Sequence, residues 1–226
     1  MNPALRASLA ELLGTFTLTF IGAGAIIATN GQNLVAIALA HGLALAMAVY
    51  ATNGHINPAV TLTMFARKRI DATLTGAYIA GQLAGAVLAA FLLRELYPNS
   101  LAPEVKLGAT LGALSTDSHA LRVLSIEAIL TFFLLITIFG TAVDKRAPKN
   151  VYGFAIGLTV CMDILAAGAL TGASMNPARS FGPALIGGFW DIHWVYWLGP
   201  ILGGLVGGYF YDFVFLAGVK EPDTKP

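Results

Sequence analysis

The tripeptide Asn-Pro-Ala occurs twice in this sequence, and each copy interrupts an otherwise apolar chain. The first copy is Asn57-Pro58-Ala59, and the second is Asn176-Pro177-Ala178, about half the chain length further on. Asn is a strong N-cap residue, and Pro is favoured in the first turn of a helix because its missing N–H has no intrahelical partner there. Each tripeptide therefore predicts the start of a short helix.

The composition explains why these interruptions matter. Charged residues make up only 11% of the chain, whereas soluble domains carry about 25%. A transmembrane helix needs about 20 mainly apolar residues, and six stretches qualify, at about 8–29, 34–52, 74–96, 121–142, 151–171 and 193–217. Two shorter apolar stretches, at about 58–66 and 177–188, follow the tripeptides. We expect an all-α polytopic membrane protein with six transmembrane helices and two re-entrant half-helices.

The two halves of the chain resemble each other beyond the tripeptides. Tyr78 matches Tyr196 at nearly the same offset, and Glu11 and Glu127 both lie early in the first span of their half. Each half then holds three spans and one half-helix, so the odd number of spans inverts the second half in the membrane. We predict a single membrane domain over 1–226, with one repeat at about 1–112, the other at about 113–226, and a site at the midplane between them.

Basic residues set the expected orientation. They concentrate in the loops on one side and near the termini: Arg6, Arg67, Lys68, Arg69, Lys145, Arg146, Lys149, Lys220 and Lys225. The other side carries Arg94, Lys106 and Arg122. Cytoplasmic loops of membrane proteins are enriched in Lys and Arg. Both termini should therefore be cytoplasmic, in a multi-pass protein of the cell (plasma) membrane.

Two half-helices that meet at the midplane would have a defined chemistry. Each helix N-terminus carries about half a positive charge, so a cation meets a barrier there and a neutral molecule does not. The amides of Asn57 and Asn176 offer N–H donors to a passing oxygen. One Cys, Cys161, and four scattered His form no metal-ligand cluster, and the net charge of +1 gives no reason to expect a nucleic-acid partner.

These features together resemble one family. Two Asn-Pro-Ala boxes, the second followed by Arg179-Ser180, in a six-span inverted repeat are similar to the aquaporin and aquaglyceroporin (major intrinsic protein) family over nearly the whole chain. The chain looks like a prokaryotic member. The resemblance implies a passive transmembrane channel in the lipid bilayer that passes water, and also ammonia, glycerol or other small neutral solutes, while it excludes protons and ions. It further implies a homotetramer, no cofactor and no enzymatic activity.

The resemblance also implies a selectivity filter. Residue by residue, His41, Ile164, Ala173 and Arg179 match its four positions, and the set is similar to the filter of plant vacuolar aquaporins. The segment before Asn57 is shorter than is usual in the family. Counting back without a gap would place Ile37 at the filter instead of His41.

Four further polar residues have alternative interpretations. By resemblance and repeat symmetry, Glu11 and Glu127 should accept hydrogen bonds from backbone N–H groups before each box, although they could be proton-relay carboxylates. His55 should brace the first loop. Asp163 precedes Ile164 in an apolar span, where it could pair with His41, bond a neighbouring span or be protonated.

Three other functions compete with a water channel. One is a facilitator of glycerol or other small solutes with low water flux. A second is a secondary transporter, which also uses inverted repeats and a midplane site. A third is a closed structural membrane protein, which the shortened segment before Asn57 would explain. The sequence carries no Ser–His or His-Glu-x-x-His signature of an intramembrane enzyme.

Overall fold

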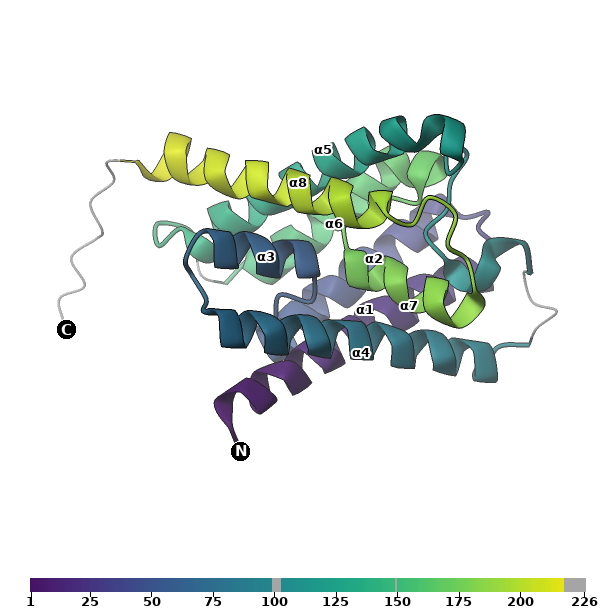
Figure 1. Ribbon diagram of the computed structural model, residues 1–226, viewed down its shortest axis with the longest axis horizontal. Coiled ribbons are helices and arrows are strands. Elements are labelled where there is room, and N and C mark those ends of the chain that lie inside the picture. The colour runs from purple at the N-terminus through teal and green to yellow at the C-terminus, as the bar shows by residue number, and fades with distance from the viewer. Residues whose placement is uncertain (99–102, 149, 218–226) are drawn as a thin grey trace.

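The computed structural model describes residues 1–98, 103–148 and 150–217, and within these ranges the chain is a bundle of helices (Figure 1). Six of them are long: α1 (Pro3–Ala28), α2 (Leu34–Thr52), α4 (Ala72–Leu96), α5 (Ala120–Ile138), α6 (Tyr152–Thr171) and α8 (Val195–Tyr211). The π-helical turns η3 (Phe139–Val143) and η4 (Asp212–Leu216) extend α5 and α8. All six are apolar enough to cross a membrane, so the predicted fold is confirmed. Lys149, Lys220 and Lys225 lie outside the described residues.

Two short helices follow the Asn-Pro-Ala boxes, as predicted. They are α3 (Pro58–Ala66) and α7 (Pro177–Gly187). In Figure 1 they enter the bundle from opposite ends, and their N-termini approach each other in the middle. The helix α7 ends at Gly188, which has a φ of 75°, a left-handed conformation that glycine adopts without steric cost.

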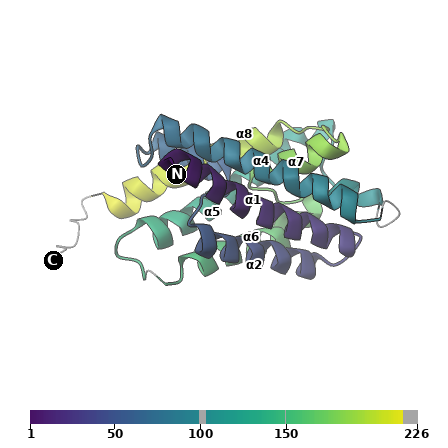
Figure 2. The ribbon, with the colours of Figure 1, turned by 90° about the horizontal axis from the view of Figure 1, so that it is seen from below.

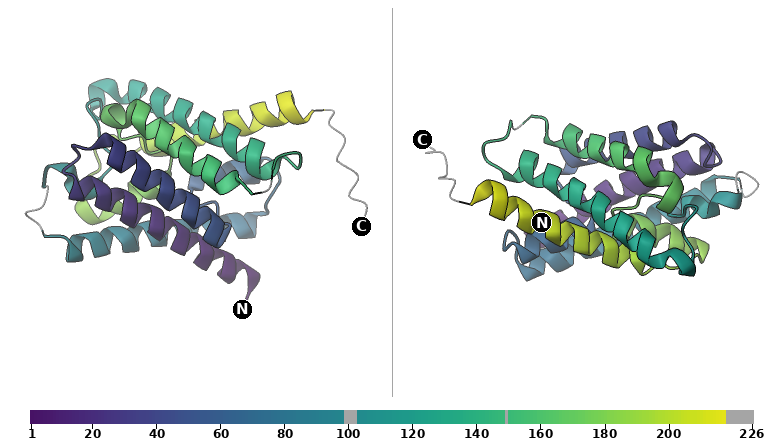
Figure 3. Two further views of the ribbon diagram at one scale, coloured as in Figure 1. Left: turned by 180° about the vertical axis from the view of Figure 1, so that it is seen from behind. Right: turned by 90° about the horizontal axis from the view of Figure 1, so that it is seen from above.

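The same Asn-Pro signal also acts at the start of the chain. The helix α1 begins at Pro3, earlier than the apolar pattern alone predicts, because the side chain of Asn2 accepts a hydrogen bond from the N–H of Ala4. Figure 2 shows α1 crossing between α4 on one side and α2 on the other. Figure 3 shows α2 beside α6 in the view from behind, and α5 beside α8 in the view from above.

Glycines allow the closest helix crossings, and they lie at matched positions of the two halves. A Cβ added at Gly85 in α4 would lie 2.2 Å from the carbonyl oxygen of Leu12 in α1. A Cβ added at Gly203 in α8 would lie 1.9 Å from the carbonyl oxygen of Ala128 in α5. Small residues let membrane helices approach closely where lipid supplies no hydrophobic driving force. The two halves therefore use the same packing device.

The loop that links the two halves is partly buried. Part of it folds into the bundle. Two short 3₁₀ helices, η1 (Pro103–Gly108) and η2 (Asp117–His119), divide it. Between them Ala109 and Thr110 are buried. This loop therefore supplies wall residues to the interior.

Ion pairs tie the helix ends together at the end of the bundle where α1 begins and α8 finishes. Arg67 and Arg69 both bond the carboxylate of Asp212, at 2.7 and 2.9 Å, and so connect the end of α3 to the end of α8. After η3, Arg146 bonds Asp144 at 2.6 Å, and this hydrogen-bonded guanidinium holds the pKa of the Asp144 carboxyl below its ordinary value.

Candidate pore and its constrictions

Each Asn-Pro-Ala box is a capped helix start. The side-chain oxygen of Asn57 accepts a hydrogen bond from Ala59 N at 2.9 Å. The equivalent oxygen of Asn176 accepts from Ala178 N at 3.1 Å and from Arg179 N at 3.2 Å. Both Asn residues have extended backbone angles, and a Pro occupies the first helical position after each. The local sequence therefore suffices to form both helix starts.

The amide nitrogens of the two boxes cross from one half to the other. Asn57 Nδ2 donates to the carbonyl oxygen of Met175, and Asn176 Nδ2 donates to that of Ile56, each at 2.8 Å. An Asn amide carries two N–H donors. One of the two N–H groups is therefore used in each box. Each amide still has a second N–H group that can donate to a solute.

Glu11 holds the segment before the first box. Its Oε1 accepts from the backbone N–H of His55 at 2.5 Å, and its Oε2 accepts from Ile56 N at 2.6 Å and from Gln82 Nε2 at 2.7 Å. The side chain is 1% exposed. These contacts place the carboxylate on the backbone N–H groups that precede the first box.

Glu127 does the same before the second box. Its Oε1 accepts from Ser174 N at 3.0 Å and from the hydroxyl of Thr171 at 2.8 Å. Its Oε2 accepts from Met175 N at 2.8 Å. A hydrogen bond to a charged group contributes about 1.5–3 kcal/mol, so this carboxylate is a large local source of stability.

The residue before each Asn is held in an unusual conformation. Ile56 has a φ of 60° and Met175 a φ of 53°, and a β-branched residue such as Ile rarely adopts positive φ. In each case the N–H donates to a buried Glu, while the C=O accepts from the Asn of the other half. The carboxylates and the crossed amides together stabilise this strained backbone.

Arg179, the residue of the second candidate constriction, contacts His41. Arg179 Nε and Nη2 lie 3.3 and 3.1 Å from His41 Nε2, and both residues are buried. His41 Nδ1 lies 2.9 Å from the carbonyl oxygen of Ile37, which can only accept. Nδ1 therefore carries the proton, and Nε2 accepts from the guanidinium.

Two residues of the linking loop complete the surroundings of Arg179. Its Nη1 donates to the carbonyl oxygen of Gly108 at 3.1 Å and to the hydroxyl of Thr110 at 2.6 Å. No motif in the sequence marks either residue. The one signal that points to them is the position of their loop between the two halves.

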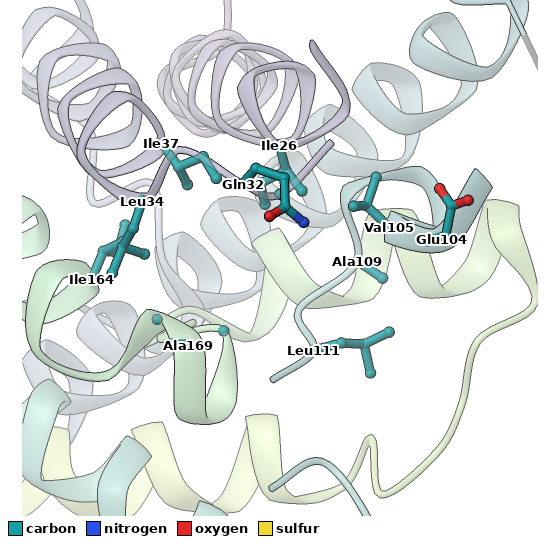
Figure 4. Close-up of a pocket in the computed structure, with 13 residues that line it drawn as sticks. Ile26, Gln32, Leu34, Ile37, Glu104, Val105, Ala109, Leu111, Ile164 and Ala169 are labelled. Carbon is teal, nitrogen blue, oxygen red and sulfur yellow. The ribbon is translucent and has the colours of Figure 1, made fainter. Parts of the chain in front are cut away.

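Ile164 and Ala173 belong to one apolar cluster, which also contains Ile37. Ile37 and Ile164 line a pocket of about 440 Å³ (Figure 4). Ile37 is one helical turn away from His41, and it faces this pocket, whereas His41 contacts Arg179. His41, and not Ile37, is therefore the residue of α2 that contacts Arg179.

Two further polar residues of the sequence analysis are His55 and Asp163. His55 Nδ1 bonds the hydroxyl of Thr61 at 3.1 Å, and its ring packs edge-on against Tyr78. Asp163 is 1% exposed, and its Oδ2 has no hydrogen-bond partner among the described residues. Both ring nitrogens of His41 are already occupied, so they are not the partner of Asp163.

Comparisons with known proteins agree with this geometry. The family model described as major intrinsic protein matches residues 1–211. Aquaporin TIP4-4 of Zea mays is 45% identical over 96% of this chain and 90% of its own length, and a probable aquaporin TIP3-2 of Arabidopsis thaliana is 41% identical over 97% and 87%. The X-ray structure of the aquaglyceroporin from Plasmodium falciparum superposes with a TM-score of 0.81 at 25% identity, covering 95% of this chain and 98% of that one.

Proposed function

The chain belongs to the major intrinsic protein family and is a passive membrane channel for water and small solutes, and from this premise we propose which residues select the solute. The pore is narrow at two constrictions. One lies at Asn57 and Asn176, and the other lies at His41, Ile164, Ala173 and Arg179. The contact of Arg179 with His41 carries this assignment, since it joins two buried polar side chains from distant segments.

The central constriction excludes cations and protons. The N-termini of α3 and α7 face each other there, and each carries about half a positive charge. The single free N–H on each Asn amide orients the oxygen of a neutral solute. This applies the established account of pores selected by diameter, lining donors, an Arg and half-helix dipoles.

The outer constriction sets the size and polarity of the solute. His41 is neutral in the tautomer described, and Arg179 supplies the fixed positive charge. Ile164 and Ala173 contribute apolar walls without hydrogen-bonding groups, and Ala173 is small. We infer that the opening passes water and ammonia. Glycerol facilitation with low water flux is the alternative, and the likeness to an aquaglyceroporin structure favours testing it.

Assembly and location follow from the same resemblance. We propose a homotetramer in the plasma membrane, with one pore in each chain and both termini in the cytoplasm. The single domain over 1–226 then holds repeat halves of about 1–112 and 113–226. The division into two repeat halves is supported by the matched pair of buried Glu residues and by the matched pair of crossed Asn amides.

The test is the substitution Arg179→Val in vesicles that contain the purified protein. It should raise the ratio of glycerol or cation flux to water flux, because it removes both the charge and the bulk of the guanidinium. Arg94→Val, which changes an exposed Arg at the end of α4, is the matched control and should leave the ratio unchanged. An unchanged ratio in Arg179→Val would refute the filter assignment.

A further inference from the structure

We propose that a pocket beside the start of α1 binds the phosphate group of an anionic phospholipid, and that an acyl chain of the same lipid lies along the adjoining face of α1. The pocket has a volume of about 320 Å³ and lies between the first turns of α1, the segment before the first Asn-Pro-Ala box, and α4. Its lining includes Arg6, Glu11, Asn53, Gly54 and Tyr78. The proposal does not depend on which solute the pore passes.

The polar side chains that line this pocket without a partner are mainly hydrogen-bond donors. Among the described residues, the guanidinium of Arg6 makes no ion pair or hydrogen bond, and neither does the amide of Asn53 or the hydroxyl of Tyr78. A guanidinium carries five N–H donors, an amide two, and a phenol one O–H. Arg binds phosphate oxygens through paired N–H groups and a full charge. The pocket therefore offers one unpaired positive charge and several donors, which is the chemistry of a phosphate site.

The carboxylate of Glu11 also borders the pocket, but it is already used inside the protein. Glu11 is 1% exposed, and its two oxygens accept from the backbone N–H groups of His55 and Ile56 and from the amide of Gln82. The hydroxyl of Thr52, which is part of the same lining, donates to a backbone carbonyl of its own helix. The groups left for a ligand therefore carry a net positive charge.

The helical positions around Arg6 join this pocket to an apolar stripe on α1. Successive residues of an α-helix are about 100° apart, so Arg6 lies about 40° from Ala10 in one direction and about 60° from Leu9 in the other. Ala10 lines the pocket. Leu5, Leu9 and Leu13 follow one another at intervals of one turn and are 53%, 47% and 55% exposed. Arg6 therefore stands at the border between the pocket and the stripe.

The depths of the pocket and of the stripe match the two parts of a phospholipid. Figure 1 shows the start of α1 at the same end of the bundle as the loop between α3 and α4, which carries Arg67, Lys68 and Arg69. Basic segments of this kind are attracted to anionic lipid surfaces. Leu13 lies about 10 Å further along α1 than Arg6, toward the hydrocarbon core. A free phosphate ion would use Arg6 alone, whereas a phospholipid would use both Arg6 and the stripe.

A ligand in this pocket would contact the segment that presents the first box. The ring of Tyr78 packs edge-on against that of His55, with 4.8 Å between their centroids. A Cβ added at Gly54 would lie 3.0 Å from Glu11 Oε1, so this segment lies close against α1. The pocket exists only when α1, α4 and this segment are in their folded arrangement. A lipid that binds there should therefore stabilise the folded channel.

The expected effect is a rise in the thermal midpoint. A ligand that binds only the folded state, at a hundred times its dissociation constant, raises the midpoint of a chain of this length by about 5–10 °C. Arg6→Gln removes a charged hydrogen bond to the phosphate, which should weaken lipid binding by about tenfold. At the same lipid concentration, the rise should then fall to about half.

The experiment measures the thermal midpoint of the purified full-length protein in a neutral detergent, with and without phosphatidylglycerol, phosphatidylcholine or glycerol 3-phosphate. Phosphatidylglycerol should raise the midpoint, and the neutral lipid and the soluble phosphate should raise it much less. Lys68→Gln is the matched control, because it removes an exposed cation at the same end of the bundle outside the pocket. It should keep the full rise, and Arg6→Lys, which keeps the charge, should keep most of it.

Two further variants separate the headgroup from the acyl chain. Tyr78→Phe removes only the hydroxyl in the pocket and should reduce the rise, and it replaces Arg6→Gln if that variant does not fold. Leu9→Gln should reduce the rise that phosphatidylglycerol produces and leave the small effect of glycerol 3-phosphate unchanged.

Four outcomes would overturn the proposal. An equal rise in Arg6→Gln and Lys68→Gln would show that the pocket does not bind the headgroup. An equal rise with phosphatidylcholine would show that the negative charge of the lipid is not recognised, and an equal rise with glycerol 3-phosphate would show that no acyl chain takes part. A Leu9→Gln variant with the full lipid effect but fewer chains in its complex would show that a second copy of the chain, and not a lipid, covers the stripe.

Discussion

Replacing Glu127 with Gln should destabilise the folded channel while leaving the solute preference of the molecules that fold unchanged. The two carboxylate oxygens each receive one backbone N–H, from Ser174 on Oε1 and from Met175 on Oε2. Gln has one oxygen and one NH₂ group in the same place. In either orientation of the amide, one of the two backbone N–H groups therefore faces another donor.

The loss of stability follows from the one backbone N–H group that is left without an acceptor. A buried donor left without a partner costs about 1–3 kcal/mol. The hydroxyl of Thr171, which also donates to Oε1, can rotate and accept from the new NH₂ group, so it adds little. For a chain of this length each kcal/mol shifts the thermal midpoint by about 2–4 °C. The expected decrease is therefore about 2–12 °C.

The assay is thermal unfolding of the purified protein, paired with the glycerol-to-water permeability ratio in vesicles. Glu95→Gln is the matched control, because Glu95 is exposed at the end of α4 and bonds only Arg94 among the described residues. It should leave the midpoint within error. Glu11→Gln should resemble Glu127→Gln, since Glu11 also serves two backbone N–H groups with two different oxygens.

Two results would refute this reasoning. A midpoint for Glu127→Gln equal to that of the unmodified protein would show that the carboxylate does not hold the segment before the second box. A normal midpoint with a loss of flux that depends on an ion gradient would instead indicate a proton-relay carboxylate and a coupled transporter.

Two other substitutions test the packing and the buried carboxyl group. Asp163→Asn should keep water flux and leave the thermal midpoint equal or higher, because Asp163 is buried and its Oδ2 has no hydrogen-bond partner among the described residues; a lower midpoint would show that the carboxyl has a required role. Gly203→Ala should reduce the yield of folded protein severalfold, since its Cβ would meet Ala128 O, whereas Gly76→Ala, with open space around it, should not; equal yields would refute the close-crossing argument.

The elements of this fold follow from local signals in the sequence. The six spans are recognisable as apolar stretches that are long enough to cross a membrane. The half-helices are recognisable because each Asn-Pro pair of this chain starts a helix, including Asn2-Pro3. Such signals need only a few neighbouring residues. This explains why the bounds of α2, α3 and α6 agree so closely with the predicted ranges.

The contacts that shape the pore depend on residues far apart in the chain. The Asn57 amide donates one N–H to Met175, and Arg179 donates one N–H to Thr110. Neither contact has a local pattern, so neither can be predicted from the sequence. The resemblance supplied His41 and Arg179 as filter positions, and it left Ile37 as an alternative, because only the packing of α2 shows which turn reaches the guanidinium.

The water permeability of the reconstituted protein tests the central claim most directly. Vesicles that contain the purified chain are mixed rapidly with a hyperosmotic solution, and their shrinkage is followed by light scattering at several temperatures. An open pore with the two constrictions described predicts shrinkage much faster than in protein-free vesicles, with an activation energy close to that of diffusion in bulk water. Shrinkage no faster than in protein-free vesicles would contradict the account and indicate a closed pore.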